Sequence, residues 1–290
     1  MRYAVRHSTV YEYGGEVAHS HHLLHLTPRA LPFQRCLKHS LTLEPEPSST
    51  RDDFDAFGNP IARVEYERPH DRLAVCSDME VEVLPRPGGA AAADSWESVR
   101  ARLRYHAAPL SAAELDAFRF RMQSSYVPIK QALGDYAQDA LAPDRPIEEA
   151  CAALAGQIHR EFRYLPGSTT NRTPITEVLQ MRRGVCQDFA HLMIGCLRSS
   201  GLAARYVSGY LRTARNGERV GGDASHAWVS VYCPPGGWVD FDPTNDCRVG
   251  EDHVTLAWGR DFGDVSPLRG TIVGGGRHKL SVDVGVRVVG

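Results

Sequence analysis

The sequence predicts an α+β protein in which a β-rich part precedes a helical part and a second group of strands. Three observations carry this prediction. Short apolar runs separated by Gly, Pro and Asp fill residues 1–84, and a Pro/Gly/Ala segment follows at 85–94. The apolar spacing then changes to that of helices. The chain has 290 residues, which is enough for two domains.

Composition and charge narrow the function classes. The content of 42% hydrophobic and 23% charged residues is ordinary for a globular protein. A formal charge of −2 gives no electrostatic reason to expect a nucleic acid or an anionic membrane as partner. No apolar run reaches the roughly 18–20 residues of a membrane span, and the N-terminal residues lack the apolar core of a signal peptide. We therefore expect a cytoplasmic protein with no nucleic-acid and no membrane partner, and its oligomeric state stays open.

Residues 1–88 are expected to form an antiparallel β-sandwich-like domain built from several short strands. The stretch from His19 to His25 is rich in histidine. On a strand, His19, His21 and His25 would share one face and His22 would oppose them. Since neither cysteines nor acidic residues cluster with them, no metal site is predicted here.

Residues 89–145 are expected to form a helical connecting segment, with Asp94 or Ser95 capping its first helix. Pro146 then opens a stronger helix whose apolar positions recur up to Phe162. Residues 146–290 are assigned to a third part, the core, which includes a final strand near 280–289.

The segment from Arg183 to Tyr210 organises the core. Its apolar residues recur with the spacing of a core-facing helix, at Phe189, Leu192, Met193, Cys196 and Leu197. Gly201 is typical of a left-handed residue that ends a helix. Cys186 therefore falls at the helix start, where free N–H groups and the helix dipole favour a thiolate. Those N–H groups could also stabilise an oxyanion, so Cys186 is the candidate nucleophile.

The other cysteines predict no site of their own. The chain has seven cysteines and no C-x-x-C pair, so neither a disulfide framework nor a structural zinc site is expected. We interpret the remaining six as buried small hydrophobes. The sequence also lacks a D-x-[DN]-x-[DN]-G calcium loop. No cofactor is predicted.

A predicted hairpin supplies a base for the cysteine. Residues 227–233 and 238–241 flank a Pro-Pro-Gly-Gly turn. His226 begins the first strand and Asp242 ends the second, so the imidazole and the carboxylate can meet across the pair. Cys186, His226 and Asp242 thus form a papain-like triad of nucleophile, base and orienting acid. Asp240 lies on the same side of an ideal strand and is the alternative orienting acid.

Other residues near the triad have more than one interpretation. Asp188 and His191 follow the cysteine and could cap the helix or face solvent. Gln187, Trp228 and Trp238 are candidate substrate contacts, although strand tryptophans are usually core. A final group of charged residues could brace the core, at Arg260, Asp261 and Asp264. The loops 166–174 and 212–225 are expected to border the cleft.

Three segments carry a resemblance to a known family. GVCQDFAHLMIGCLRSSGLAARYVSGY, SHAWVSVY and GWVDFDPTND closely resemble the core of bacterial transglutaminase-like proteins. The resemblance extends to FRYLPGSTTNRTPITEVL, to GRDFGDVSPLRG, and to an N-terminal β-rich domain at YEYGGEV and HLLHLTPR. It implies a papain-like core and places the family's triad on Cys186, His226 and Asp242. It is weakest at 90–145.

The resemblance implies thioester chemistry on a peptide or protein substrate. Hydrolysis of a peptide or amide bond is the first hypothesis, and transfer of the acyl group to an amine is the second. They differ only in whether water or an amine resolves the thioester. A non-catalytic peptide-binding module is the third hypothesis, against which the intact triad argues. The animal transglutaminases require calcium, and nothing in this chain indicates such a requirement.

Overall fold

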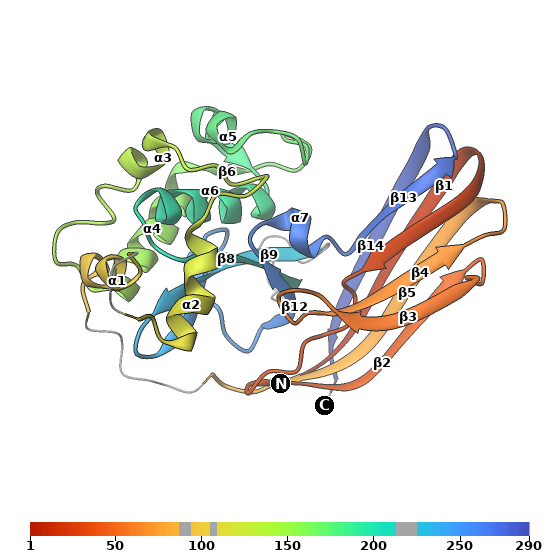
Figure 1. Cartoon of the computed structure of the whole chain (residues 1–290), viewed down its shortest axis with the longest axis horizontal. Coiled ribbons are helices and arrows are strands. Elements are labelled where there is room, and N and C mark those ends of the chain that lie inside the picture. Colours follow the sequence, from red (N-terminus) through yellow and green to blue (C-terminus); the bar gives the residue numbers. More distant parts are fainter. Residues whose placement is uncertain (87–93, 105–108, 213–224, 290) are drawn as a thin grey trace.

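The computed structural model describes residues 1–86, 94–104, 109–212 and 225–289. A helical layer on a five-stranded sheet lies beside a second, elongated sheet (Figure 1). The elements up to the linker are β1 (Arg2–Leu24), β2 (Gln34–Glu44), β3 (Ser49–Phe54), β4 (Pro60–Tyr66) and β5 (His70–Val83). The middle elements are α1 (Trp96–Arg102), α2 (Ala112–Phe118), η1 (Arg119–Arg121), α3 (Gln131–Tyr136), α4 (Ile147–Glu161), β6 (Arg163–Tyr164), α5 (Ile175–Met181) and β7 (Arg183–Gly184). The last elements are α6 (Cys186–Ser199), β8 (Ala204–Leu211), β9 (His226–Cys233), β10 (Gly237–Asp242), β11 (Cys247–Arg248), β12 (His253–Gly259), α7 (Phe262–Val265), β13 (Leu268–Gly274) and β14 (His278–Val288).

The N-terminal domain is one antiparallel sheet organised around β1. The strands follow the order β2-β5-β1-β4-β3, and β13 and β14 also pair with β1. Along its first half β1 pairs with β5 and β14, and along its second half with β4 and β13. The sheet curls around a small apolar cluster that includes Leu24, Val64 and Leu73. The expected antiparallel β-domain is confirmed, but the expected short strands before residue 25 are wrong, because β1 runs for 23 residues.

The two last strands differ from the expected division of the chain. Residues 146–290 were assigned to the core, yet β13 and β14 hydrogen-bond to β1 in the N-terminal sheet. The register joins Tyr3 to Val288 and Tyr13 to His278. A period-2 pattern predicts a strand but not the strand with which it pairs. Only the tertiary structure therefore shows that these residues belong to the N-terminal sheet. The boundaries 1–88 and 89–145 stay predictions, and most of the expected linker lies outside the described residues.

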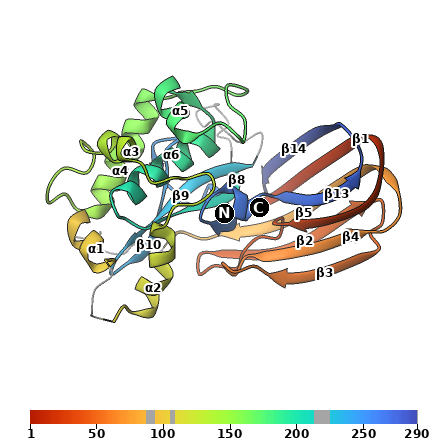
Figure 2. The same ribbon diagram turned by 45° about the horizontal axis from the view of Figure 1, so that its top comes forward.

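The core consists of helices packed on the sheet β11-β10-β9-β8-β12, which is antiparallel throughout (Figures 1 and 2). Helix α6 lies on β8 and β9, and α4 lies on β10. The predicted stripe of α6 is fully buried, which explains why this helix forms and where it docks. Gly201 has φ +83°, the left-handed conformation expected after the helix end. The predicted α+β class is confirmed.

The two domains share polar contacts. His7 on β1 lies 2.9 Å from the Tyr210 hydroxyl on β8. Arg86 donates to Asp240 at 2.9 Å.

No helix in the described part of the chain is long and apolar enough to cross a membrane. The cytoplasmic location stays a prediction.

Candidate active site

Cys186 is the first residue of α6, as its position before the apolar stripe predicts. Its side chain is 7% exposed, and its Sγ lies 4.0 Å from the carbonyl oxygen of Ser225. Asp188 caps the helix start, because its Oδ2 accepts from the backbone N–H of Val185 at 2.8 Å. Gly184 permits this approach, since a Cβ there would lie 2.7 Å from Asp188 Oδ2. The thiol is thus fixed at the N-terminal end of a buried helix.

The hairpin of β9 and β10 brings the two predicted partners together. His226 Nε2 and Asp242 Oδ2 are 2.8 Å apart, and both side chains are completely buried. The other ring nitrogen, His226 Nδ1, is buried and has no partner other than the Cys186 thiol in the described part of the chain. Cys186 is near enough to raise the pKa of His226. Nδ1 is therefore the nitrogen left to interact with the thiol.

Asp242 is a buried carboxylate whose two oxygens accept several hydrogen bonds from the protein. Its Oδ1 accepts from the backbone N–H of Thr244 at 2.9 Å and of Asn245 at 3.3 Å. Its Oδ2 accepts from His226, from Asn245 Nδ2 at 2.7 Å, and lies 3.3 Å from His253 Nε2. Burial alone would raise the pKa of Asp242, but the charges and hydrogen bonds of His226 and His253 lower it well below its usual range.

The contact between Asp242 and His226 also shifts the pKa of His226. Burial alone would lower the pKa of His226, but the charge and hydrogen bond of Asp242, with the Cys186 thiol, raise it above its ordinary value. The contact with Asp242 therefore favours the cationic form of the imidazole. A cationic imidazole beside a thiol at a helix N-terminus can stabilise a thiolate and can later release a proton.

Asp240, the alternative orienting acid, has other partners. Its Oδ2 accepts from Arg86 at 2.9 Å and from Trp228 Nε1 at 3.2 Å. Arg205 lies close enough to lower the pKa of Asp240 further against the effect of burial. Asp242, not Asp240, orients His226.

The expected substrate contact of Trp228 is wrong. Its ring is 0% exposed and packs with Val207, Val249 and Trp258 beneath the His226–Asp242 pair. Trp238 is half-buried, lies at the end of β10 remote from Asp242 and packs edge-on against Phe120, and its contact with substrate stays a prediction. The alternating sequence pattern predicts that both tryptophans lie on strands, but it does not show which other residues pack over them. Gln187 is half-buried beside Cys186, and its contact with substrate stays a prediction.

The remaining polar residues of α6 and α7 brace the site. His191 is buried, stacks on Tyr126 with ring centroids 5.5 Å apart, and accepts from the backbone N–H of Phe262 at 3.1 Å. Burial lowers the pKa of His191 to about 4, so it is neutral. Asp261 caps α7 by accepting from Gly263 N–H at 2.9 Å. Of the loops expected at the cleft, 213–224 lies outside the described residues.

The sequence interpretation missed two residues. His253 begins the edge strand β12 and contacts Asp242 at the end of β10, although β8 and β9 lie between the two strands in the sheet. Burial raises the pKa of Tyr206 on β8, and the proximity of Cys186 adds to the rise. Tyr206 lies within the segment that carries Cys186, but nothing in that segment marks it as a neighbour of the thiol, and His253 lies outside the segments that resemble the family. Only the strand order could have found them.

Metal-ligating residues meet at one place in the described part of the chain. The nearest side-chain atoms of His226, Asp242 and His253 lie within 4.8 Å of one another. Hydrogen bonds of the carboxylate to both imidazoles account for this cluster without a metal. The histidines near the N-terminus do not converge: His19 and His21 are exposed, and the buried His25 lies 3.2 Å from Asp55. His25 follows the end of β1, so the expected shared face is wrong.

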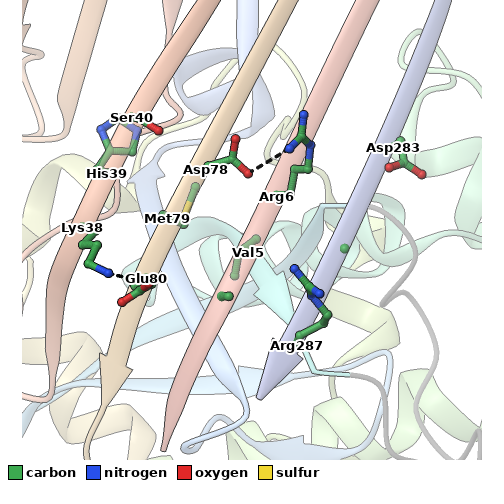
Figure 3. Close-up of a pocket in the computed structure, with 12 residues that line it drawn as sticks. Val5, Arg6, Lys38, His39, Ser40, Asp78, Met79, Glu80, Asp283 and Arg287 are labelled. Atoms are coloured by element: carbon green, nitrogen blue, oxygen red, sulfur yellow. Dashed lines mark hydrogen bonds and ion pairs between the residues drawn. The ribbon is translucent and has the colours of Figure 1, made fainter. Parts of the chain in front are cut away.

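A cavity of about 770 Å³ lies in the N-terminal domain, not at the triad (Figure 3). Strands β2, β5, β1 and β14 line it. Its charges pair across neighbouring strands, with Arg6 3.5 Å from Asp78 and Lys38 2.9 Å from Glu80. Such pairs are typical of a solvated sheet face, and we assign no ligand to this cavity.

Two protein-family models and several known proteins match this chain. The model of the bacterial transglutaminase-like N-terminal region matches residues 3–82, and that of the transglutaminase-like superfamily matches residues 134–243. An uncharacterized protein of Mycobacterium tuberculosis is 40% identical over 99% of this chain and 92% of its own length. An uncharacterized protein of Mycobacterium leprae is 33% identical over 98% and 97%.

Two further similarities concern named proteins. A protein-glutamine gamma-glutamyltransferase of Pseudomonas aeruginosa is 33% identical over 32% of this chain and 15% of its own length. The solved structure of a "Putative Cysteine Protease" from Cytophaga hutchinsonii has a TM-score of 0.77 and covers 99% of this chain and 90% of its own. At 20% identity, that likeness shows the fold alone. This chain belongs to the transglutaminase-like superfamily and carries the bacterial transglutaminase-like N-terminal region.

Proposed function

We propose that this protein is a cysteine hydrolase that cleaves peptide or isopeptide amide bonds through a thioester, with Cys186 as nucleophile. The observation that carries the proposal is the buried pair of His226 and Asp242, 2.8 Å apart, beside a cysteine that starts a helix. A buried ion pair is costly unless its groups are well hydrogen-bonded. A buried imidazole with one nitrogen left for a thiol is the arrangement that nucleophilic catalysis needs.

In the first half-reaction, Cys186 Sγ attacks the carbonyl carbon of the scissile amide and the C–S bond forms. The carbonyl oxygen becomes an oxyanion, which the backbone N–H of Cys186 stabilises. His226 donates its Nδ1 proton to the departing nitrogen as the C–N bond breaks. The amine leaves, and the acyl group stays on sulfur as a thioester.

In the second half-reaction, His226 is neutral and acts as a base. It removes a proton from water, whose oxygen attacks the thioester carbon. The C–S bond breaks, the carboxylic acid leaves, and Cys186 and His226 return to the thiolate and the imidazolium. Asp242 accepts the Nε2–H of His226 throughout, which fixes the tautomer that presents Nδ1 to the sulfur.

The test is release of amine from peptide libraries, including peptides with isopeptide bonds, followed by mass spectrometry. We expect turnover that iodoacetamide blocks and that Cys186→Ala abolishes. Cys196→Ala is the matched control, because that cysteine lies on the buried stripe of the same helix. Turnover that survives Cys186→Ala would refute the proposal.

Acyl transfer to an amine is the second candidate, supported by the similarity to the Pseudomonas aeruginosa gamma-glutamyltransferase. It uses the same thioester and differs in the group that resolves it. Incorporation of a labelled primary amine into a glutamine peptide, at the expense of free acid, would favour transfer. If Cys186 shows no reactivity in the folded protein, both candidates fail and a peptide-binding role remains.

A further inference from the structure

A second histidine contacts the acid of the candidate triad. His253 Nε2 lies 3.3 Å from Asp242 Oδ2, the atom that also contacts His226 Nε2 at 2.8 Å. His253 is 2% exposed, and its ring packs edge-on against Trp228 with centroids 5.3 Å apart. The imidazole is therefore held firmly against the carboxylate.

His253 starts β12, an edge strand of the core sheet that pairs on one side with β8. On the free edge of β12, two side-chain amides of the N-terminal domain, those of Gln34 and Asn59, hydrogen-bond to its backbone. Gln34 Oε1 accepts from Thr255 N–H at 2.7 Å, and Gln34 Nε2 donates to the Thr255 carbonyl at 2.7 Å. Asn59 makes the same two bonds to Trp258, at 2.9 and 2.8 Å.

These amides replace a neighbouring strand. Each offers one donor and one acceptor to a single residue, as a paired strand would, and both are 0% exposed. The Arg29 guanidinium adds to the contact, because it stacks 3.5 Å above the Trp258 ring. The backbone of β12 is thus bound from both sides, and its first residue reaches Asp242.

We propose that His253 is a positioning residue of the triad and that the N-terminal domain acts on catalysis by holding β12 through Gln34 and Asn59. This inference depends on the proposed function, since it assigns a role to the N-terminal domain within the same site. The N–H of His253 fixes the Asp242 carboxylate in the plane that His226 requires. His253 acts through Asp242 and does not touch the reacting atoms.

The test needs no substrate. The rate of iodoacetamide alkylation at Cys186 is measured by mass spectrometry between pH 5 and 9 in the full-length protein. We compare His253→Leu, which removes the donor, with His253→Gln, whose Nε2 can still donate to the carboxylate. His22→Leu is the control, because His22 is a buried histidine of the N-terminal domain remote from the triad.

We expect His253→Leu to slow alkylation at pH 7 about tenfold and to move the midpoint of its pH profile, the loss of one charge-assisted hydrogen bond being of that size. His253→Gln should retain most of the rate, and His22→Leu should match the wild type. Gln34→Ala should slow alkylation less, and its effect should vanish in the His253→Leu background.

Each contrary result has one meaning. Wild-type rates for His253→Leu, or equal losses for Leu and Gln, would overturn the role of His253. Additive effects of Gln34→Ala and His253→Leu would overturn the link to the N-terminal domain. If His253→Leu does not fold, His253→Gln and Gln34→Ala still decide. If wild-type Cys186 is no more reactive than in His226→Ala, the proposed function itself fails.

Discussion

At the scale of single residues, the buried carboxylate of Asp242 is the most constrained group of the candidate site. Two backbone N–H groups, one side-chain amide and two imidazoles surround its two oxygens. Such saturation keeps a buried carboxylate ionised. It also means that His226 is oriented by an anion that cannot rotate.

Asp242→Asn should lower kcat about 10²–10⁴-fold with a much smaller change in KM, because the neutral amide no longer holds the His226 tautomer or its charge. Turnover and Cys186 alkylation both measure this loss. Asp240→Asn, two residues away on the same strand, should leave Cys186 alkylation near the wild-type rate, because Asp240 binds Arg86. Equal losses for the two variants would contradict the assignment.

At the scale of elements, the start of α6 depends on a cap that the sequence left undecided. The Asp188 carboxylate accepts from Val185 N–H at 2.8 Å and from the Thr169 hydroxyl at 2.7 Å. Burial raises the pKa of Asp188, and these two bonds oppose the rise. The cap therefore ties the loop before α5 to the helix that carries the thiol.

Asp188→Ala should lower the free energy of unfolding by about 1–3 kcal/mol, because the Val185 N–H loses its acceptor. Asp188→Asn should cost less than half of that, since its Oδ1 can still accept. Urea unfolding at pH 7 measures both. Equal losses would show that the charge, and not the hydrogen bond, stabilises the helix start.

Strand β8 pairs with β9 and β12, and this packing leaves no room for a side chain at Gly209. Gly209 is paired with His226 on the neighbouring strand β9. A Cβ there would lie 2.1 Å from the Val254 carbonyl oxygen and 2.5 Å from the Trp228 ring. Gly209→Ala should cost at least about 1–3 kcal/mol and should slow Cys186 alkylation. Gly285→Ala on β14 is the control, because its Cβ meets nothing within 4 Å. An unchanged melting temperature for Gly209→Ala would refute this packing.

At the scale of the whole molecule, buried histidines make stability depend on pH from both sides. Burial lowers the pKa of His7 and of His22 to about 4. Between about pH 6.5 and 4 the unfolded chain therefore binds protons that the folded chain does not, and stability falls as the pH falls. His226 acts in the opposite direction. Its raised folded-state pKa gives stability that is complete below about 6.5 and is lost as the pH rises toward the folded value.

We therefore expect the free energy of unfolding to be greatest near pH 6–7. His7→Gln should flatten the acid side by about 2 kcal/mol between pH 6.5 and 4, and His226→Gln should flatten the alkaline side. Urea titrations at half-unit pH intervals measure both slopes. An acid slope unchanged by His7→Gln would show that the pKa of His7 is not lowered in the folded protein.

Local patterns determined the central elements of the core and the residues of the candidate triad. Apolar spacing located α6, a Pro-Pro-Gly-Gly turn located the hairpin, and Cys186, His226 and Asp242 came from the ends of these elements. Such features are local, because a helix face or a two-strand hairpin needs no distant partner. A strand pattern does not show what covers a face of the sheet, so it could not show that Trp228 is completely buried.

Only the tertiary structure decided which strands share a sheet. It joined β13 and β14 to β1, placed β12 beside β8, and thereby brought His253 to Asp242 and Gln34 to β12. These contacts join residues that are 11 and 221 positions apart. The strand order that brings these residues together is held by backbone hydrogen bonds. Any strand of suitable period can form such bonds, so the sequence does not show which strands will pair.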